Sequence, residues 1–105
     1  MKTNADVSAM LDAMTATLHA IRCVTDERGR QLEKWGVQNH SPLEWMGILG
    51  EEYGEAMREA IEHHWRDKHY VQDPDRLARY RAELVQVAAV AVAAIESLDR
   101  NELKV

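Results

Sequence analysis

Residues 84–95 read Leu-Val-Gln-Val-Ala-Ala-Val-Ala-Val-Ala-Ala-Ile, and this stretch decides the fold of the chain. Only Gln86 in it is polar, and apolar side chains continue at helical spacing from Leu77 to Leu98, so we expect one long helix here. A helix that is apolar on all sides has to be covered on all sides. Three helices of one short chain do this poorly, so we expect a second subunit to pack there. Coverage by the N-terminal helix is the alternative.

Two further helices are expected upstream of this stretch. The second of them begins at Ser41-Pro42-Leu43-Glu44, which supplies an N-cap, a proline at the first helical position and a capping-box glutamate, and it runs to about His64. The same cap logic starts the last helix at Asp73-Pro74. The first helix is expected to continue to Lys34, and its single apolar stripe consists of Val7, Met10, Leu11, Met14, Leu18 and Ile21.

The pattern as a whole predicts an all-α protein. No segment alternates with a period of two over a useful length, so we expect no sheet. The chain has five glycines and two prolines, which favours long helices over a meander of short strands. Its 105 residues are enough for one domain, residues 1–105. We therefore expect a bundle of long antiparallel helices that oligomerisation completes.

Charge and cysteine content limit the partners of the chain. Thirteen Lys and Arg against eighteen Asp and Glu give a net charge of −5, which weighs against binding a nucleic acid polymer. Cys23 is the only cysteine, so no intrachain disulfide forms and an intracellular protein is indicated. Asp6 and Asp12 interrupt any apolar signal segment, and residues 84–95 are too short to span a bilayer. We expect a cytoplasmic location and no membrane partner.

An acidic stripe follows from the spacing of glutamates in the second expected helix. Residues 51–62 hold five glutamates and one arginine, Arg58. The glutamates fall on one arc of the helix, roughly 100° wide. A solvated helix face is the plain interpretation, but such faces usually place lysines near glutamates at i,i+4. An all-negative stripe repels itself unless something cationic binds to it.

A lone carboxylate interrupts the apolar face of the last helix. Glu83 projects into the middle of this face, between Val87 and Val90. A carboxylate in such a place is costly unless it is paired, protonated or bound to a metal. A buried ion pair with Arg28 or Arg81 is the structural alternative to a metal.

Four oxygen-bearing side chains fall at matching positions on the two helices. Glu52 and Glu55 are three residues apart, as are Glu83 and Gln86, so each pair projects together. If the helices pack antiparallel, the two pairs face one another. Oxygen ligands without histidine or cysteine suit Mg²⁺ or Mn²⁺. A di-iron carboxylate bundle would use Glu-x-x-His motifs, and the sequence has none.

The order and spacing of these residues resembles the MazG-like members of the all-α nucleoside triphosphate pyrophosphohydrolase superfamily. That family's signature is E-E-x-x-E on one helix and E-x-x-D on a later one. The first half stands here as Glu51-Glu52-Tyr53-Gly54-Glu55, and the second as Glu83-Leu84-Val85-Gln86, with Gln in the place of Asp. The runs that begin at Glu33 and Glu83 also look like phage and bacterial MazG-like proteins. The resemblance covers roughly residues 27–98.

The resemblance implies hydrolysis of a nucleoside triphosphate between its α and β phosphates, with release of a nucleoside monophosphate and pyrophosphate. It implies Mg²⁺ held by Glu52, Glu55 and Glu83, with Glu51 as a further ligand or as the residue that orients the attacking water. It also implies a dimer or a tetramer. The expected role is the removal of surplus or non-standard (d)NTPs. Gln86 takes one negative charge out of the family's site, while its carbonyl oxygen still suits Mg²⁺.

The nucleotide's phosphates and base need further partners. Lys34 and Trp35 offer a phosphate contact and a stacking surface, with a solvated lysine and a core-capping tryptophan as the alternative. Gln38 and His40 follow in the same connection, although a loop histidine is more often simply exposed. Arg81 flanks Glu83, where it reaches either a phosphate or the acidic stripe.

Two other kinds of function remain open at this stage. One is a non-catalytic helical dimer that binds nucleotide or a protein partner, with Gln86 marking the lost chemistry. The other is a structural helical module whose glutamate stripe is merely solvated. An effect of Mg²⁺ on stability separates the structural module, which should show none, from the enzyme and the binding protein. Turnover of a nucleotide separates the enzyme from the binding protein.

Overall fold

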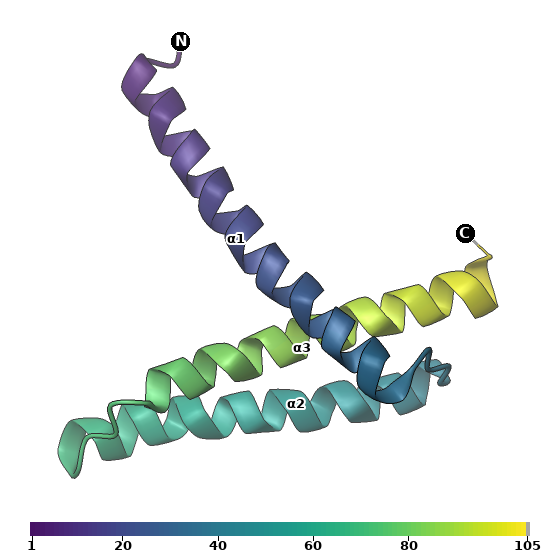
Figure 1. Ribbon diagram of the computed structural model, residues 1–105. Coiled ribbons are helices and arrows are strands. Elements are labelled where there is room, and N and C mark those ends of the chain that lie inside the picture. The colour runs from purple at the N-terminus through teal and green to yellow at the C-terminus, as the bar shows by residue number, and fades with distance from the viewer. Residues whose placement is uncertain (105) are drawn as a thin grey trace.

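The computed structural model describes residues 1–104 and contains no strand in that range, which confirms the all-α prediction (Figure 1). Within the same range no helix combines the length and the apolar character that crossing a membrane requires. Two π-helical turns extend the second and third helices. The elements in order are α1 (Asn4–Trp35), α2 (Pro42–Glu62), η1 (His63–Asp67), α3 (Arg76–Leu98) and η2 (Asp99–Leu103).

The predicted start of α2 is confirmed, and that of α3 is wrong by two residues. Ser41 Oγ accepts a hydrogen bond from the Glu44 amide, and Glu44 Oε1 accepts one from the Ser41 amide, which completes the capping box. At α3 the Asp73 side chain instead accepts from the amide of Asp75, and the helix begins only at Arg76. The Asp73 carboxylate, predicted to cap the helix, therefore forms an Asx turn instead.

Helices α2 and α3 run antiparallel, side by side, and form the core (Figure 1). Trp45 on α2 packs against Val90 and Ala93 on α3, and all three are buried. The small side chains of Ala89 on α3 and Ala56 on α2 are buried as well. This packing brings the acidic stripe of α2 opposite the first half of α3.

An ion-pair network ties the loop end of the α2–α3 pair together. Arg76 at the start of α3 contacts Glu59 at 3.3 Å, Asp67 at 3.2 Å and Asp73 at 3.7 Å. Asp67 is buried, and the Arg76 side chain is only 16% exposed. Since removing one member would leave buried charges unpaired, this network holds the end of the hairpin in one geometry.

The C-terminal third of helix α1 crosses α3, and the N-terminal part of α1 projects away from the α2–α3 pair (Figure 1). Arg28 anchors the crossing through a 3.0 Å ion pair to Glu96. Residues 1–22 are all exposed, so the apolar stripe of the N-terminal half does not cover α3 within one chain. The alternative coverage of α3 considered from the sequence is therefore wrong for this part of α1.

Candidate metal centre

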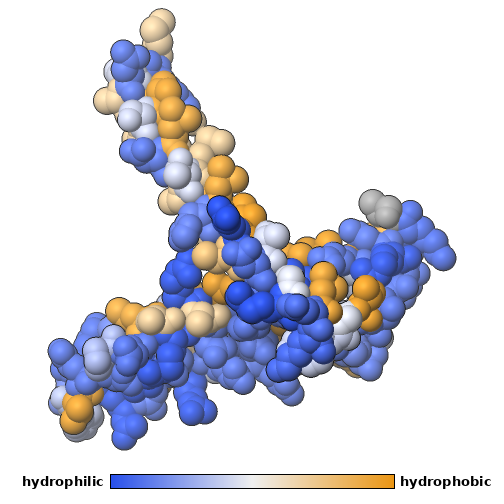
Figure 2. Space-filling model, viewed as in Figure 1, coloured by the Kyte–Doolittle hydropathy of each residue, from blue (hydrophilic) through white to orange (hydrophobic). Residues whose placement is uncertain are grey.

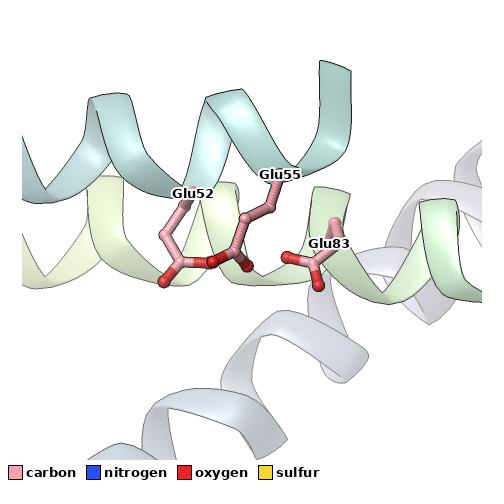
Figure 3. Close-up of side chains that lie close together, drawn as sticks. All are labelled: Glu52, Glu55 and Glu83. Atoms are coloured by element: carbon pink, nitrogen blue, oxygen red, sulfur yellow. The ribbon is translucent and has the colours of Figure 1, made fainter. Parts of the chain in front are cut away.

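Three glutamates from two helices converge on one point between α2 and α3. Glu52 and Glu55 lie one turn apart on α2, and Glu83 reaches toward them from α3 (Figure 3). One carboxylate oxygen from each residue lies within 4.8 Å of the other two. Helical spacing explains the first pair, because residues three apart share a helix face. Antiparallel packing supplies the third, as the sequence pattern required.

Among residues 1–104 Glu83 has no cationic partner. Its Oε2 is buried and makes no hydrogen bond in the structure. The alternative ion pair with Arg28 or Arg81 does not form, because Arg28 binds Glu96 and the Arg81 guanidinium lies 3.5 Å from Cys23 Sγ. A buried carboxylate oxygen without a donor loses its hydration and gains nothing in return.

Burial and mutual repulsion shift the acidity of the cluster in one direction. Burial raises the pKa of Glu83, and the neighbouring Glu55 and Glu52 carboxylates raise it further. Burial likewise raises the pKa of Glu52, and the negative charges of Glu55, Glu51 and Glu27 raise it further. Both groups therefore hold a proton more strongly than an ordinary glutamate does. A bound cation would reverse this preference, because it stabilises the ionised form.

The C-terminal end of the acidic stripe, Glu59 and Glu62, is neutralised by arginines, in contrast to the cluster. Glu59 contacts Arg76 at 3.3 Å and Arg79 at 3.5 Å. Glu62 contacts Arg66 at 3.4 Å. Among residues 1–104 no such ion pair reaches Glu52, Glu55 or Glu83. The stripe is thus compensated at its C-terminal end and left negative where the three carboxylates meet.

Gln86, the fourth expected ligand, is held by α1. Its Oε1 accepts a 3.3 Å hydrogen bond from Gln31 Nε2, and Gln31 Oε1 accepts a 2.8 Å bond from Arg28. Gln31 is buried and was missed by the sequence analysis. The helical spacing could have identified Gln31, because it lies four residues after Glu27 and the two share the face of α1 that meets α3. The carbonyl oxygen of Gln86 is therefore already engaged in this structure.

Two other expected residues flank the cluster. Glu51 is exposed on α2, beside the cluster and outside it. Arg81 is exposed on α3 and lines a surface cleft of about 320 Å³ between α1 and α3. Gln86 and Glu27 line the same cleft. A ligand in this cleft would meet two arginines, Arg30 and Arg81, and two acidic residues, Asp26 and Glu27, beside the amide of Gln86.

The remaining expected substrate residues gather at the α1–α2 connection. Lys34 Nζ lies 4.8 Å from the centre of the Trp35 ring, and this ring is 55% exposed, so Trp35 does not cap the core. The Gln38 carbonyl accepts a 3.2 Å bond from Arg100 of η2. His40 packs edge-on against Trp45, with ring centres 4.8 Å apart. The structure thus places Lys34, Trp35, Gln38 and His40 at the connection between α1 and α2, and none of them belongs to the carboxylate cluster.

His40 also borders a pocket that the sequence analysis did not find. The pocket has a volume of about 180 Å³ and is mostly apolar, with walls from Trp45, Ile95 and Leu98. Trp45 Nε1 is buried and has no acceptor in the described part of the chain. A donor with no partner beside an apolar hollow is a feature of a ligand pocket, whereas a well-packed core pairs its polar atoms.

The candidate site consists of three converging carboxylates that no cation of the described residues neutralises. Such a set of hard oxygen atoms suits Mg²⁺ or Mn²⁺ and offers nothing to a soft metal. Comparison of the chain with protein-family models, with curated proteins and with solved structures found no match.

Proposed function

We propose that the chain is a Mg²⁺-dependent nucleotide pyrophosphohydrolase that cleaves a (d)NTP to the (d)NMP and pyrophosphate and removes surplus or non-standard nucleotides. One observation carries the proposal. One carboxylate oxygen each of Glu52, Glu55 and Glu83 lie within 4.8 Å of one another without a cationic partner among residues 1–104, while arginines neutralise Glu59 and Glu62 on the same helix. This distribution of charge supports a cation site at the cluster, because unpaired carboxylates held close together repel one another unless a cation binds between them.

The three carboxylates fit Mg²⁺ in chemistry and in spacing. Mg²⁺ takes oxygen ligands at about 2.0–2.1 Å, so opposite ligands lie roughly 4.2 Å apart. Oxygens that already lie within 4.8 Å of one another need only small rotations to share one ion. Glu83 Oε2, buried and without a donor, is the ligand atom that gains most from such an ion. Mn²⁺ prefers the same ligands and is the expected substitute.

The residues around the cluster have separate roles in this proposal. A bound Mg²⁺ would neutralise the charge of the triphosphate and make a nearby water more acidic. Glu51 is one turn before Glu55 on α2 and exposed, so it is placed to orient that water and accept its proton. Arg81 is available to a phosphate, because among residues 1–104 its guanidinium forms no ion pair and contacts only the Cys23 thiol as a hydrogen-bond partner. Lys34, Trp35, Gln38 and His40 are proposed to contact the nucleoside.

The resemblance to MazG-like proteins supports the same function. Its two half-motifs are far apart in the sequence, and their acidic residues Glu52, Glu55 and Glu83 lie together in the structure. A chance arrangement of glutamates on two helices would not require this. The reaction, the metal and the family are proposed together, since each rests on these residues.

A non-catalytic binding protein is the second candidate, and one observation favours it. Gln86 stands where the resembled family has Asp, and its carbonyl oxygen is bonded to Gln31. The site then offers three carboxylates to a metal, with a neutral amide turned toward α1. A chain of this kind would bind a nucleotide or a protein partner as a helical dimer without turnover.

A homodimer or a tetramer belongs to the proposal as well. Leu84, Ile95 and Leu98 of α3 remain 43%, 56% and 38% exposed in the single chain. These are large apolar side chains on the helix whose sequence is apolar on nearly all sides. A second subunit would remove them from water, as expected from the sequence.

The experiment that tests the proposal is pyrophosphate release from a panel of standard and modified (d)NTPs, with Mg²⁺ and with EDTA. Metal-dependent release from any of them supports the enzyme. In parallel, thermal unfolding is followed in EDTA and in millimolar Mg²⁺. A rise in Tm with Mg²⁺ but without turnover supports the non-catalytic binding protein. If Mg²⁺ causes neither turnover nor a rise in Tm, the hydrolase and the binding protein are both contradicted, and the structural module with a solvated glutamate stripe remains.

A further inference from the structure

A chain of hydrogen bonds connects α1 to the residue one turn after Glu83. The guanidinium of Arg28 binds both carboxylate oxygens of Glu96, through Nε at 3.3 Å and through Nη2 at 3.0 Å. Its third nitrogen, Nη1, donates to Gln31 Oε1 at 2.8 Å. Gln31 Nε2 in turn donates to Gln86 Oε1 at 3.3 Å. We call these four residues, Glu96, Arg28, Gln31 and Gln86, the amide relay.

The direction of the amide relay follows from the chemistry of its donors. A guanidinium carries donors only, so the end of the Gln31 amide that faces Arg28 has to be its oxygen. The other end of the same amide is then a donor, and the atom of Gln86 that faces it has to be an oxygen as well. Turning the Gln86 amide over would set two NH₂ groups against each other. Gln31 is only 7% exposed, and a mismatch of this kind at a buried residue is costly.

The crossing of α1 over α3 sets the amide relay in place. In the single chain the N-terminal arm of α1 stands free, with apolar side chains along it, and residues 1–22 are all exposed (Figure 2). The tertiary contacts of α1 are therefore made by its C-terminal third, mostly with α3. Two members of the relay, Arg28 and Gln31, come from α1, and the other two come from α3. The Arg28 side chain is 14% exposed, so both relay residues of α1 are largely buried.

The amide relay decides which end of the Gln86 side chain is left for a ligand. Its oxygen, the only atom of an amide that binds a cation, is turned to α1. The end that is left is Nε2, a donor, and a cation is repelled by it. A donor one turn after Glu83 weakens the binding of a cation to the carboxylate cluster, where an oxygen would strengthen it.

We infer that Gln31 is a positioning residue of the candidate metal centre. Through the amide relay it holds the Gln86 oxygen away from the ion, so that the contact between α1 and α3 sets the affinity of the cluster for Mg²⁺. This inference rests on the proposed function, because it takes the carboxylate cluster to bind a cation. It adds the residue that controls the fourth ligand position, and that residue lies on a helix that carries none of the three carboxylates.

Gln31→Glu inverts the amide relay. A carboxylate accepts from Arg28 and offers only acceptors to Gln86, so the Gln86 amide has to turn its Nε2 to α1 and its oxygen outward. The dissociation constant of Mn²⁺ is measured on the full chain by electron paramagnetic resonance, with Mg²⁺ as competitor and without a nucleotide. We expect Gln31→Glu to tighten Mn²⁺ binding about tenfold, the lower end of the effect that partners of metal ligands have on affinity.

Gln86→Met is the matched control, because it keeps the length of the side chain and removes its oxygen. In the native background it should change the dissociation constant of Mn²⁺ by less than about twofold, since the oxygen is not a ligand there. Combined with Gln31→Glu it should abolish the gain, whereas a gain caused by the added negative charge alone would persist. Gln31→Met adds no charge and also releases the Gln86 oxygen, so it should tighten binding in the same Gln86-dependent way.

Circular dichroism of each variant checks that the helices are kept. Weaker Mn²⁺ binding by Gln86→Met in the native background would overturn the inference, because the oxygen would then already be a ligand. Equal gains with and without the Gln86 oxygen, or no gain in either Gln31 variant, would overturn it too. The proposed function fails in a different way: a native chain that binds no Mn²⁺ contradicts the cation site itself, and the inference with it.

Discussion

Gln31 on α1 donates a 3.3 Å hydrogen bond to the side-chain oxygen of Gln86 on α3. This contact joins the helix that crosses the pair to the residue one turn after Glu83. Gln31 in turn accepts from Arg28, whose guanidinium also binds Glu96. The four side chains form a continuous polar chain between α1 and α3, next to the carboxylate cluster. The position of Gln86 beside the cluster therefore depends on a contact with α1.

Removal of Gln31 should destabilise the fold. Gln31→Ala deletes a buried side chain and leaves the Gln86 oxygen and one Arg28 donor without a partner. We expect a loss of roughly 1–3 kcal/mol in the free energy of unfolding, measured by urea denaturation. Gln38→Ala is the matched control, because Gln38 is exposed, and it should change that free energy by less than about 0.5 kcal/mol. Equal effects would contradict the structural role of the Gln31 contact.

Restoring the family's aspartate should preserve or raise turnover. Gln86→Asp returns one negative charge to the neighbourhood of Glu83, which strengthens binding of a divalent cation. The measurement is kcat/KM for pyrophosphate release, over a series of Mg²⁺ concentrations. A sharp loss of activity would mean that the glutamine has its own role at this position. If the native chain has no activity and Gln86→Asp has activity, the native protein is a binding protein that lacks turnover because of Gln86.

Neutral replacements in the carboxylate cluster should abolish turnover and leave the fold intact. Glu52→Gln and Glu83→Gln keep the size of the side chain and remove a charged ligand, so we expect Mg²⁺-dependent turnover to fall at least about 100-fold. Glu33→Gln, at an exposed position on α1, is the control. Near-native rates in either cluster variant would show that the ligand assignment is wrong. Mn²⁺ binding followed by electron paramagnetic resonance gives the same answer without turnover.

Without metal, Glu83→Gln should stabilise the protein near neutral pH. The pKa of Glu83 is raised in the folded state, so this group favours folding below its ordinary pKa and loses that contribution as the pH rises through the raised value. In EDTA at about pH 7.5 we expect a gain on the order of 1 kcal/mol, or about 4–8 °C in Tm. The gain should shrink toward zero near about pH 4, where the native carboxyl is protonated.

Millimolar Mg²⁺ should invert this order of stability. The native chain gains Tm from binding the ion, and Glu83→Gln gains little, because it lacks one ligand. Thermal unfolding of both proteins in the two buffers measures the crossover. If the variant is less stable than the native chain in EDTA at neutral pH, Glu83 has a partner that the structure does not show.

Arg76 should be the most important arginine for stability. Arg76→Ala leaves Asp67 and Glu59 without their shared cation, so we expect a clear loss in the free energy of unfolding, larger than that of any other arginine in the chain. Arg58→Ala is the control on the exposed side of α2 and should stay within about 0.5 kcal/mol. A similar small effect for Arg76 would mean that water replaces the guanidinium in the network.

Much of the fold was predictable because it depends on local sequence. The capping box at Ser41 and Glu44 set the start of α2, and the apolar run from Leu84 to Ile95 set α3 as a helix. The start of α3 was misplaced because an aspartate before a helix serves a cap or an Asx turn equally well, and only the backbone path decides between them. The convergence of Glu52, Glu55 and Glu83 was likewise predictable, given antiparallel packing.

The sequence by itself determined which residues are helical and which carboxylates share a helix face, because both follow from the helical repeat and from the chemistry of neighbouring residues. Only the tertiary structure decided that Arg28 would pair with Glu96 and not with Glu83, and that Gln31 would occupy the oxygen of Gln86. It also decided that the N-terminal stripe would stand free of α3. These outcomes depend on the place where α1 crosses α3, and contacts between segments far apart in the chain set that place.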